Sequence, residues 1–151
     1  RRLERSKNGC PPVSVSTARR MAPVKAVFDS NILIDYLNGE RKAVTEISRY
    51  QKRLISRITW MEVLIGAQTE VAKDAAFSCF QLFNVVEVTE EVALRAIEIR
   101  SQYRLKLPDA IILGTARTYR CLLVTRNTVD FSAKKFADVR EPYRLSRGKQ
   151  N

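Results

Sequence analysis

The sequence predicts an α/β protein whose central sheet is mostly parallel and covered by helices on both faces. Short apolar stretches of strand length alternate along the chain with stretches of helical apolar spacing. The 151 residues, 45% of them hydrophobic, are enough for one buried core. The longest apolar runs are far too short to cross a bilayer, so we expect a single cytoplasmic domain.

The first half of the chain contains two strand-like stretches, each followed by helical spacing. The expected elements are a strand over 24–28, helices over 32–37 and 44–50, a strand over 53–56, and helices over 60–68 and 72–83. Asp29 ends the first strand. Thr59 is expected to cap the helix over 60–68, because Glu62 stands three positions later as in a capping box.

The second half repeats the alternation. The expected elements are a strand over 85–88, helices over 92–103 and 108–119, a strand over 121–125 and an edge strand beginning at 139. Thr89 is followed by two glutamates, which is typical of a cap and first helical turn. Pro108 suits the first position of its helix, because that position needs no N–H donor. The stretch over 121–125 is fully apolar, as expected for a buried parallel strand.

Charge divides the chain unevenly. The formal net charge is +11, of which residues 1–20 supply +5. Because Met21 resembles a start, we expect 1–20 to be a disordered extension, 21–145 the domain and 146–151 a flexible tail. A transit peptide is the alternative for 1–20, which the prolines at 11–12 disfavour. The domain itself is still basic, which suits either a phosphate backbone or a plain solvated surface.

Histidine is absent, and the three cysteines, Cys10, Cys79 and Cys121, are far apart. The absence of histidine excludes a Ser-His-Asp triad, and the separated cysteines argue against a thiolate zinc site and a disulfide framework. Cys79 and Cys121 have apolar neighbours and are expected in the core. There is also no GxxxxGK or GxGxxG phosphate loop. Catalysis would therefore depend on carboxylates, hydroxyls, lysines or arginines.

Four acids stand where a parallel sheet would gather them. Asp29 directly follows the first strand, and Asn127 and Asp130 follow the strand over 121–125. Asp109 lies in the first turn of a helix, and Glu62 lies one turn into a helix that follows a strand. Since parallel strands end at a common edge, these side chains are expected to lie close together.

Each acid also has a purely structural explanation, as a helix cap, a favourable charge in a first helical turn, or a turn residue. However, Asp29, Glu62 and Asp109 lie within apolar sequence, where a carboxylate is costly to bury without a partner. A bound cation would be such a partner. Because the available ligands are oxygens only, the ion favoured is Mg²⁺ or Mn²⁺, which could activate water for phosphodiester hydrolysis.

Four segments together resemble the motifs of PIN-domain ribonucleases, and most closely the VapC-type toxins of bacterial type II toxin–antitoxin systems. They are AVFDSNILIDYLNG, ITWMEVLIGA, LPDAIILGTA and LLVTRNTVDF, in family order. The similarity covers nearly all of residues 24–131. It implies a three-layer α/β/α sandwich, a Mg²⁺- or Mn²⁺-dependent endoribonuclease, a transfer or ribosomal RNA substrate, a homodimer, and a small antitoxin that blocks the site.

The resemblance also assigns roles to residues. It implies that Asp29, Glu62 and Asp109 are the core catalytic metal ligands and that Asp130 is the fourth, although some members carry that acid at the position of Asn127. The small polar residues that would orient ligands or phosphate are Ser30, Asn31 and Thr125. Arg126, beside the site, is a candidate phosphate contact or a plain surface arginine.

Two other functions remain open on sequence grounds. One is a PIN fold without activity that serves as an RNA-binding or scaffold module, although all three core acids are present. The other is a receiver-like signalling domain, which is disfavoured because the first strand supplies only Asp29 rather than a pair of acids. Trp60, Tyr36 and Tyr103 could stack on bases but are expected to be core or dimer-interface residues.

Overall fold

The computed structural model describes residues 24–132 and 134–146. Within these ranges, five strands form one sheet in the order β3-β2-β1-β4-β5, and every neighbouring pair is parallel. The strands are β1 (Lys25–Phe28), β2 (Lys52–Ser56), β3 (Asn84–Val86), β4 (Leu122–Val124) and β5 (Val139–Arg140). The predicted α/β fold is confirmed, with Val139 beginning an edge strand as expected.

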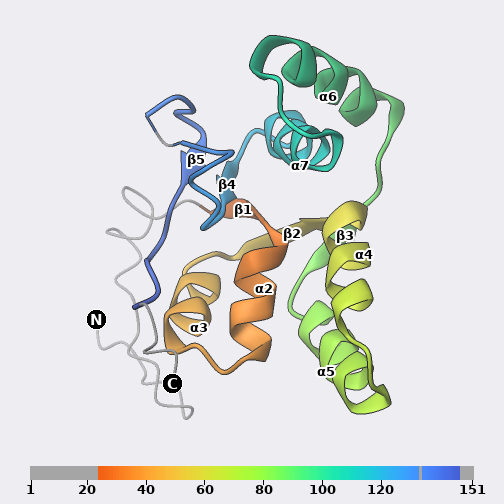
Figure 1. Cartoon of the computed structure of the whole chain (residues 1–151), viewed down its shortest axis with the longest axis vertical. Helices are drawn as coiled ribbons and strands as arrows, with labels where there is room; N and C mark the ends of the chain where they lie inside the picture. The colour runs from red at the N-terminus through yellow and green to blue at the C-terminus, as the bar shows by residue number, and fades with distance from the viewer. Residues whose placement is uncertain (1–23, 133, 147–151) are drawn as a thin grey trace, which may run out of the picture.

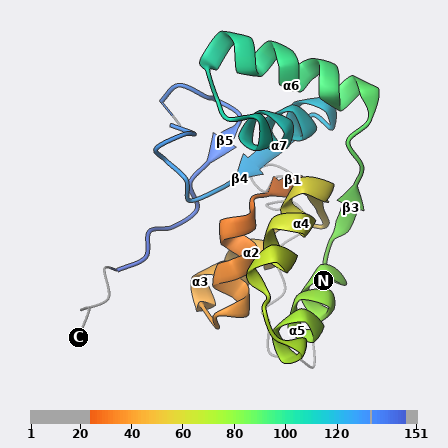
Figure 2. The same cartoon turned by 45° about the vertical axis from the view of Figure 1, so that its right-hand side comes forward.

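In the described part of the chain, six helices cover the two faces of the sheet. They are α2 (Ser30–Leu37), α3 (Arg41–Ser48), α4 (Arg57–Gly66), α5 (Glu70–Phe80), α6 (Glu90–Tyr103) and α7 (Leu107–Thr118). Helices α6 and α7 lie together on one side, whereas α2 to α5 lie on the other (Figure 1). The turned view shows the same two helical layers with the strands between them (Figure 2). The three-layer sandwich expected from the resemblance is therefore confirmed.

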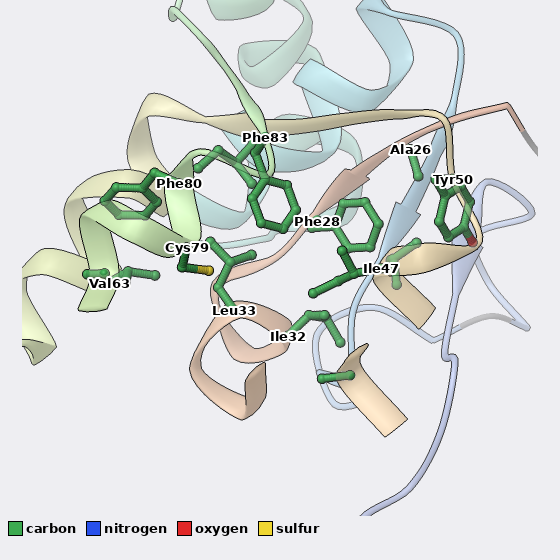
Figure 3. Packing of buried hydrophobic residues seen from close by; sticks show 14 of the residues in the cluster. Ala26, Phe28, Ile32, Leu33, Ile47, Tyr50, Val63, Cys79, Phe80 and Phe83 are labelled. Carbon is green, nitrogen blue, oxygen red and sulfur yellow. The ribbon is translucent and has the colours of Figure 1, made fainter. Parts of the chain in front are cut away.

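Alternate side chains of β1 enter opposite layers, as the period of a strand requires. Ala26 and Phe28 pack with α2 to α5, while Val27 packs with α6 and α7. Phe28 is fully buried, and its ring meets those of Tyr50 and Phe83 edge-on at 5.3 and 5.4 Å (Figure 3). The last residue of β1 is therefore anchored in the apolar core of this layer, and this packing holds the end of the strand in place.

Helices α6 and α7 approach each other very closely at Gly114. A Cβ atom at this position would lie 3.2 Å from the backbone nitrogen of Ala96 and 3.3 Å from the carbonyl oxygen of Val92. Both are backbone atoms, so a larger side chain would have to push the helices apart. Gly114 thus sets the separation at which α7, the helix that carries Asp109, packs on α6.

The start of α4 differs from the prediction. Thr59 does not cap this helix, because α4 begins at Arg57, two residues before Thr59. Ser56 is the cap, and its hydroxyl accepts a hydrogen bond from the N–H of Ile58 at 3.1 Å. The strand β2 therefore runs into α4 without a loop. Thr59 lies inside the helix with its hydroxyl buried and without a partner in the described structure.

The caps of the other two predicted helices agree more closely with the structure. Thr89 caps α6 by accepting from the N–H of Val92 at 3.3 Å, as predicted. Pro108 occupies the second rather than the first position of α7, whose cap residue is Lys106. The difference is one residue, and Asp109 remains in the first turn as expected.

Some of the predictions concern residues outside the described ranges, namely the extension over 1–20 with Cys10, and the end of the tail over 147–151. Of the two described cysteines, Cys79 is buried and Cys121 is half-buried, each packed with a core layer as expected. Within the described part of the chain, none of the helices combines the length and apolarity that a membrane crossing requires.

Candidate active site

Asp29 stands at the carboxyl end of β1, where it is also the cap residue of α2. Its carboxylate accepts hydrogen bonds from the N–H of Ser30 at 2.8 Å, the hydroxyl of Thr125 at 2.7 Å and the amide of Asn31 at 3.2 Å. The residue is only 4% exposed. Burial raises the pKa of Asp29, and these hydrogen bonds counteract the rise only in part. The structural explanation by capping therefore applies to Asp29, which also lies at the strand end where the sequence predicts a site.

The loop after β4 brings the other predicted polar residues to the same edge. Thr125 is buried, and its hydroxyl oxygen accepts from the backbone N–H of Asn127 at 3.0 Å and from the amide of Asn31 at 3.1 Å. The amide of Asn127 donates to the carboxylate of Asp130 at 2.9 Å, and the N–H of Asp130 donates back to Asn127 at 3.2 Å. Asn127 thereby orients Asp130.

Glu62 and Asp109 face the same group of charges from α4 and α7. Partial burial and the negative charges of Asp29 and Asp109 raise the pKa of Glu62 to about 7, although the residue keeps much of its surface in solvent. Burial and the charges of Asp29 and Asp130 raise the pKa of Asp109 to about 6, with Lys106 acting in the opposite direction. Glu62 therefore feels the charges of Asp29 and Asp109, and Asp109 feels those of Asp29 and Asp130, so the predicted acids are electrostatic neighbours.

Mutual repulsion is what a cation would relieve, so the arrangement can be compared with the needs of a metal ion. Within 24–132 and 134–146, no group of three or more His, Cys, Asp or Glu side chains converges on one metal position. The carboxylates are thus neighbours rather than a closed cage. Mg²⁺ commonly binds through one or two carboxylates and keeps several waters, and the donors here are all oxygens. The residues fit a hydrated Mg²⁺ or Mn²⁺ ion.

Arg126, considered above as a phosphate contact or a surface arginine, binds a carboxylate of the protein itself. Its guanidinium donates to both carboxylate oxygens of Asp35, from Nε and, at 2.8 Å, from Nη2. The hydroxyl of Tyr143 also donates to Asp35, at 2.8 Å. Sequence reasoning missed Asp35 and Tyr143. Asp35 could have been found, because it stands between Ile34 and Tyr36 in the same kind of apolar sequence that drew attention to Asp29.

The three aromatic residues considered for base stacking pack against the protein itself. Trp60 stacks on Phe80 and holds the guanidinium of Arg57 over its ring at 4.7 Å. Tyr103 meets Phe136 edge-on at 4.7 Å, and Tyr36 packs against the layer that contains Phe28. The prediction that these residues serve packing is confirmed for their contacts within the chain.

Known proteins resemble this chain in both sequence and fold. Ribonuclease VapC2 of Methanocaldococcus jannaschii is 27% identical over 144 residues, covering 81% of this chain and 97% of that protein. A chain of a toxin–antitoxin complex from Klebsiella pneumoniae is 40% identical, with a TM-score of 0.73, covering 80% of this chain and 99% of that chain. FitAcB from Neisseria gonorrhoeae, at 22% identity and a TM-score of 0.66, covers 80% of this chain and 99% of that chain and shares the fold.

The PIN domain family model matches residues 26–137. The matched segment includes strands β1 to β4 and the carboxylates of Asp29, Glu62, Asp109 and Asp130. A receiver-like domain, the signalling alternative raised by the sequence, is not supported, since the match extends over most of the chain. The protein belongs to the PIN-domain family.

Proposed function

We propose that this protein is a Mg²⁺- or Mn²⁺-dependent endoribonuclease and the toxin of a toxin–antitoxin pair. The observation that carries the proposal is the cluster of Asp29, Glu62, Asp109 and Asp130 at the carboxyl edge of the sheet. Within it, burial and the charges of neighbouring carboxylates raise the pKa of Glu62 and of Asp109. Carboxylates that are kept together with raised pKa values are typical of functional sites. The ribonuclease and toxin–antitoxin relatives support the proposal.

The chemistry follows from the roles that each side chain can take. A divalent ion bound here would acidify a water and offset the charge that develops on the phosphate. Asp29, Glu62 and Asp109 would hold the ion, and Asp130 would assist from the loop after β4. Thr125 and Asn31 hold the Asp29 carboxylate in one orientation. A bound divalent ion would offset the charges of Asp29 and Asp109 that help to raise the pKa of Glu62, so Glu62 would be ionised at neutral pH.

The proposal also names partners. The substrate would be RNA, such as a transfer or ribosomal RNA, attracted by the basic surface. A small antitoxin would bind the protein and block the site, and the similar chain from Klebsiella pneumoniae is itself part of a toxin–antitoxin complex. We also propose a homodimer and a cytoplasmic location.

The second candidate function is a PIN domain that binds RNA without cleaving it. This function differs from that of a ribonuclease in one measurable property.

That property is metal-dependent cleavage. Incubation of the purified protein with total transfer and ribosomal RNA should give discrete fragments, resolved on a denaturing gel. EDTA should stop the reaction, and Mn²⁺ added in excess should restore it, because a divalent ion is what organises the repelling carboxylates and activates the water. Cleavage that persists in EDTA would rule out the metal mechanism. RNA binding without any cleavage would favour the inactive module.

The raised pKa values also predict how stability depends on pH. In EDTA, the folded protein holds protons on Glu62 up to about pH 7 and on Asp109 up to about pH 6, where the unfolded chain has already lost them. The stability that these two groups contribute is therefore complete below about pH 4 and is lost as the pH rises through 6 to 7.

Urea unfolding of the wild type and of Asp109→Asn at pH 5 and pH 7.5 measures this effect. The free energy of unfolding should fall more between the two pH values in the wild type than in the variant, which lacks one of the repelling charges. Comparing the two proteins cancels the contribution of carboxylates elsewhere in the chain. An equal fall in both would mean that Asp109 is not protonated more readily in the folded state.

A further inference from the structure

Asp35 is a buried acid that the proposed chemistry does not use. It lies on α2, is 5% exposed, and has both carboxylate oxygens occupied. Arg126 contacts each oxygen, and Tyr143 shares one of them at 2.8 Å. These partners lie 91 and 108 residues further along the chain. Asp35 therefore joins α2, the loop after β4 and the segment after β5 at one point.

Helix α2 contacts both the backbone N–H and the guanidinium of Arg126. Asp35 binds its guanidinium, while the side-chain oxygen of Asn31 accepts from its backbone N–H at 3.0 Å. Asn31 and Asp35 are four residues apart and hence on the same face of the helix. The amide of Asn31 in turn donates to Asp29 at 3.2 Å and to Thr125 at 3.1 Å. A continuous set of hydrogen bonds thus leads from Asp35 to the buried carboxylate of the candidate site.

We propose that Asp35 is a positioning residue of the ribonuclease site, acting through Arg126, with Tyr143 fixing its carboxylate. The inference rests on the proposed function. Arg126 stands between Thr125, which donates to Asp29, and Asn127, which orients Asp130. Fixing Arg126 at both ends fixes the start of this loop, and with it the relative placement of two of the four carboxylates.

Stability alone does not explain this arrangement. A buried ion pair costs much of its attraction in lost hydration, and apolar replacements of similar volume are often as stable. What a two-pronged arginine–carboxylate pair supplies is a defined geometry. The pair also lies where geometry matters, since it contacts the loop that carries Asn127 and Asp130 rather than a remote surface.

A second buried acid of the same kind provides a matched control. Glu46 on α3 is 3% exposed and accepts from Arg49 at 2.9 Å and from Arg140 at 3.0 Å. Like Asp35, it joins a helix of this layer to the C-terminal part of the chain. Within the described residues, the side-chain hydrogen bonds of Glu46, Arg49 and Arg140 do not reach the four carboxylates. The backbone carbonyl of Arg140 accepts from the N–H of Thr125 at 3.0 Å, and Glu46→Gln leaves this backbone contact in place. Glu46→Gln therefore removes a comparable pair without touching the site.

The test compares Asp35→Asn with Glu46→Gln in Mn²⁺, using a pool of random-sequence single-stranded RNA as the substrate. We expect kcat to fall about 10- to 100-fold in Asp35→Asn, because small displacements of catalytic groups have effects of this size. KM should change by less than about threefold, since RNA binding depends mainly on surface charge. Glu46→Gln should keep kcat within about threefold of the wild type. An equal fall of kcat in both variants would overturn the proposal.

Arg126→Lys provides a second route if Asp35→Asn does not fold. Lysine keeps the charge but cannot contact both carboxylate oxygens, so kcat should again fall while KM holds. Full activity in Arg126→Lys would contradict the positioning role. Tyr143→Phe leaves the arginine pair intact and removes one hydrogen bond from Asp35, so its effect should be smaller than that of Arg126→Lys.

Hydrogen exchange separates this inference from the proposed function. The backbone amides of residues 126–130 should exchange at least about tenfold faster in Asp35→Asn than in the wild type, and at the wild-type rate in Glu46→Gln. If the wild type cleaves no RNA, the proposed function fails, but the exchange measurement still decides whether Asp35 holds the loop. Unchanged exchange in Asp35→Asn would overturn the positioning role.

Discussion

Replacing Asp109 by asparagine is expected to lower RNA cleavage about 10³-fold while the protein stays folded. Asparagine has nearly the same shape but no charge, so it cannot help to hold a divalent ion. The same change removes one of the two charges that raise the pKa of Glu62. Less repulsion remains among the other carboxylates, so the free energy of unfolding at pH 7.5 in EDTA should rise slightly.

Rates of cleavage in Mn²⁺ and urea unfolding curves measure the two effects on one preparation. Asp74→Asn is the matched control, because Asp74 is exposed on α5 and the chemical change is identical. It should leave cleavage within about twofold of the wild type. If Asp109→Asn retained more than a tenth of the activity, Asp109 would not belong to the catalytic site.

Asp29 is less suited to this test than its place in the site suggests. Its side chain caps α2 and accepts from Thr125 and Asn31, so alanine would remove a cap and leave buried donors without their partner. The lost cap alone costs about 1 kcal/mol. A loss of activity in Asp29→Ala would therefore mix chemistry with stability, and Asp29→Asn is the better variant.

The largest loss of stability is expected from Phe28→Ala, at about 3–5 kcal/mol of the free energy of unfolding. Phe28 is fully buried, and its ring is surrounded by the edges of two other aromatic rings. Alanine would leave a cavity that Tyr50 and Phe83 cannot both fill. Because a small domain is stable by only about 5–15 kcal/mol, the variant should unfold at a much lower urea concentration.

Phe77→Ala is the control for this change, because Phe77 lies on α5 and is 48% exposed. Burial of less surface should limit its cost to about half that of Phe28→Ala or less. Equal destabilisation by the two variants would contradict the view that the layer under β1 supplies the main apolar stabilisation. Since Phe28 directly precedes Asp29, the Phe28→Ala variant should also lose cleavage in proportion to its unfolded fraction.

The sequence was most informative where the signal was local. Alternating strand and helical spacing predicted a sheet with a helical layer on each face, because each element must bury its apolar side chains. The acids at strand ends could be grouped, since a parallel sheet brings its carboxyl ends to one edge. Helix caps also depend on nearby residues. The cap predicted at Thr59 was wrong, because β2 continues directly into α4 and Ser56 is the cap, and Pro108 was one position off.

Contacts between distant segments could not be predicted in this way. Arg126 was considered as a phosphate contact or a surface arginine because it stands beside the site in sequence, and the structure shows its guanidinium bound to Asp35 on α2. Nothing local at Arg126 or at Tyr143 indicates that partner. Arg126 and Asp35 can meet only because β4 lies beside β1 in the sheet. This contact depends on the strand order and not on the residues that neighbour either side chain in sequence.

The strand order has a consequence for the folding of the protein during its synthesis on the ribosome. Strands β4 and β5 are made last, yet β4 pairs with β1, which is made first. Thr125, which binds the Asp29 carboxylate, and Tyr143, which binds Asp35, both belong to this late part of the chain. A growing chain therefore lacks an assembled carboxylate cluster until nearly all of the described residues have emerged. Assembly of the site is therefore a late event in the synthesis of this chain.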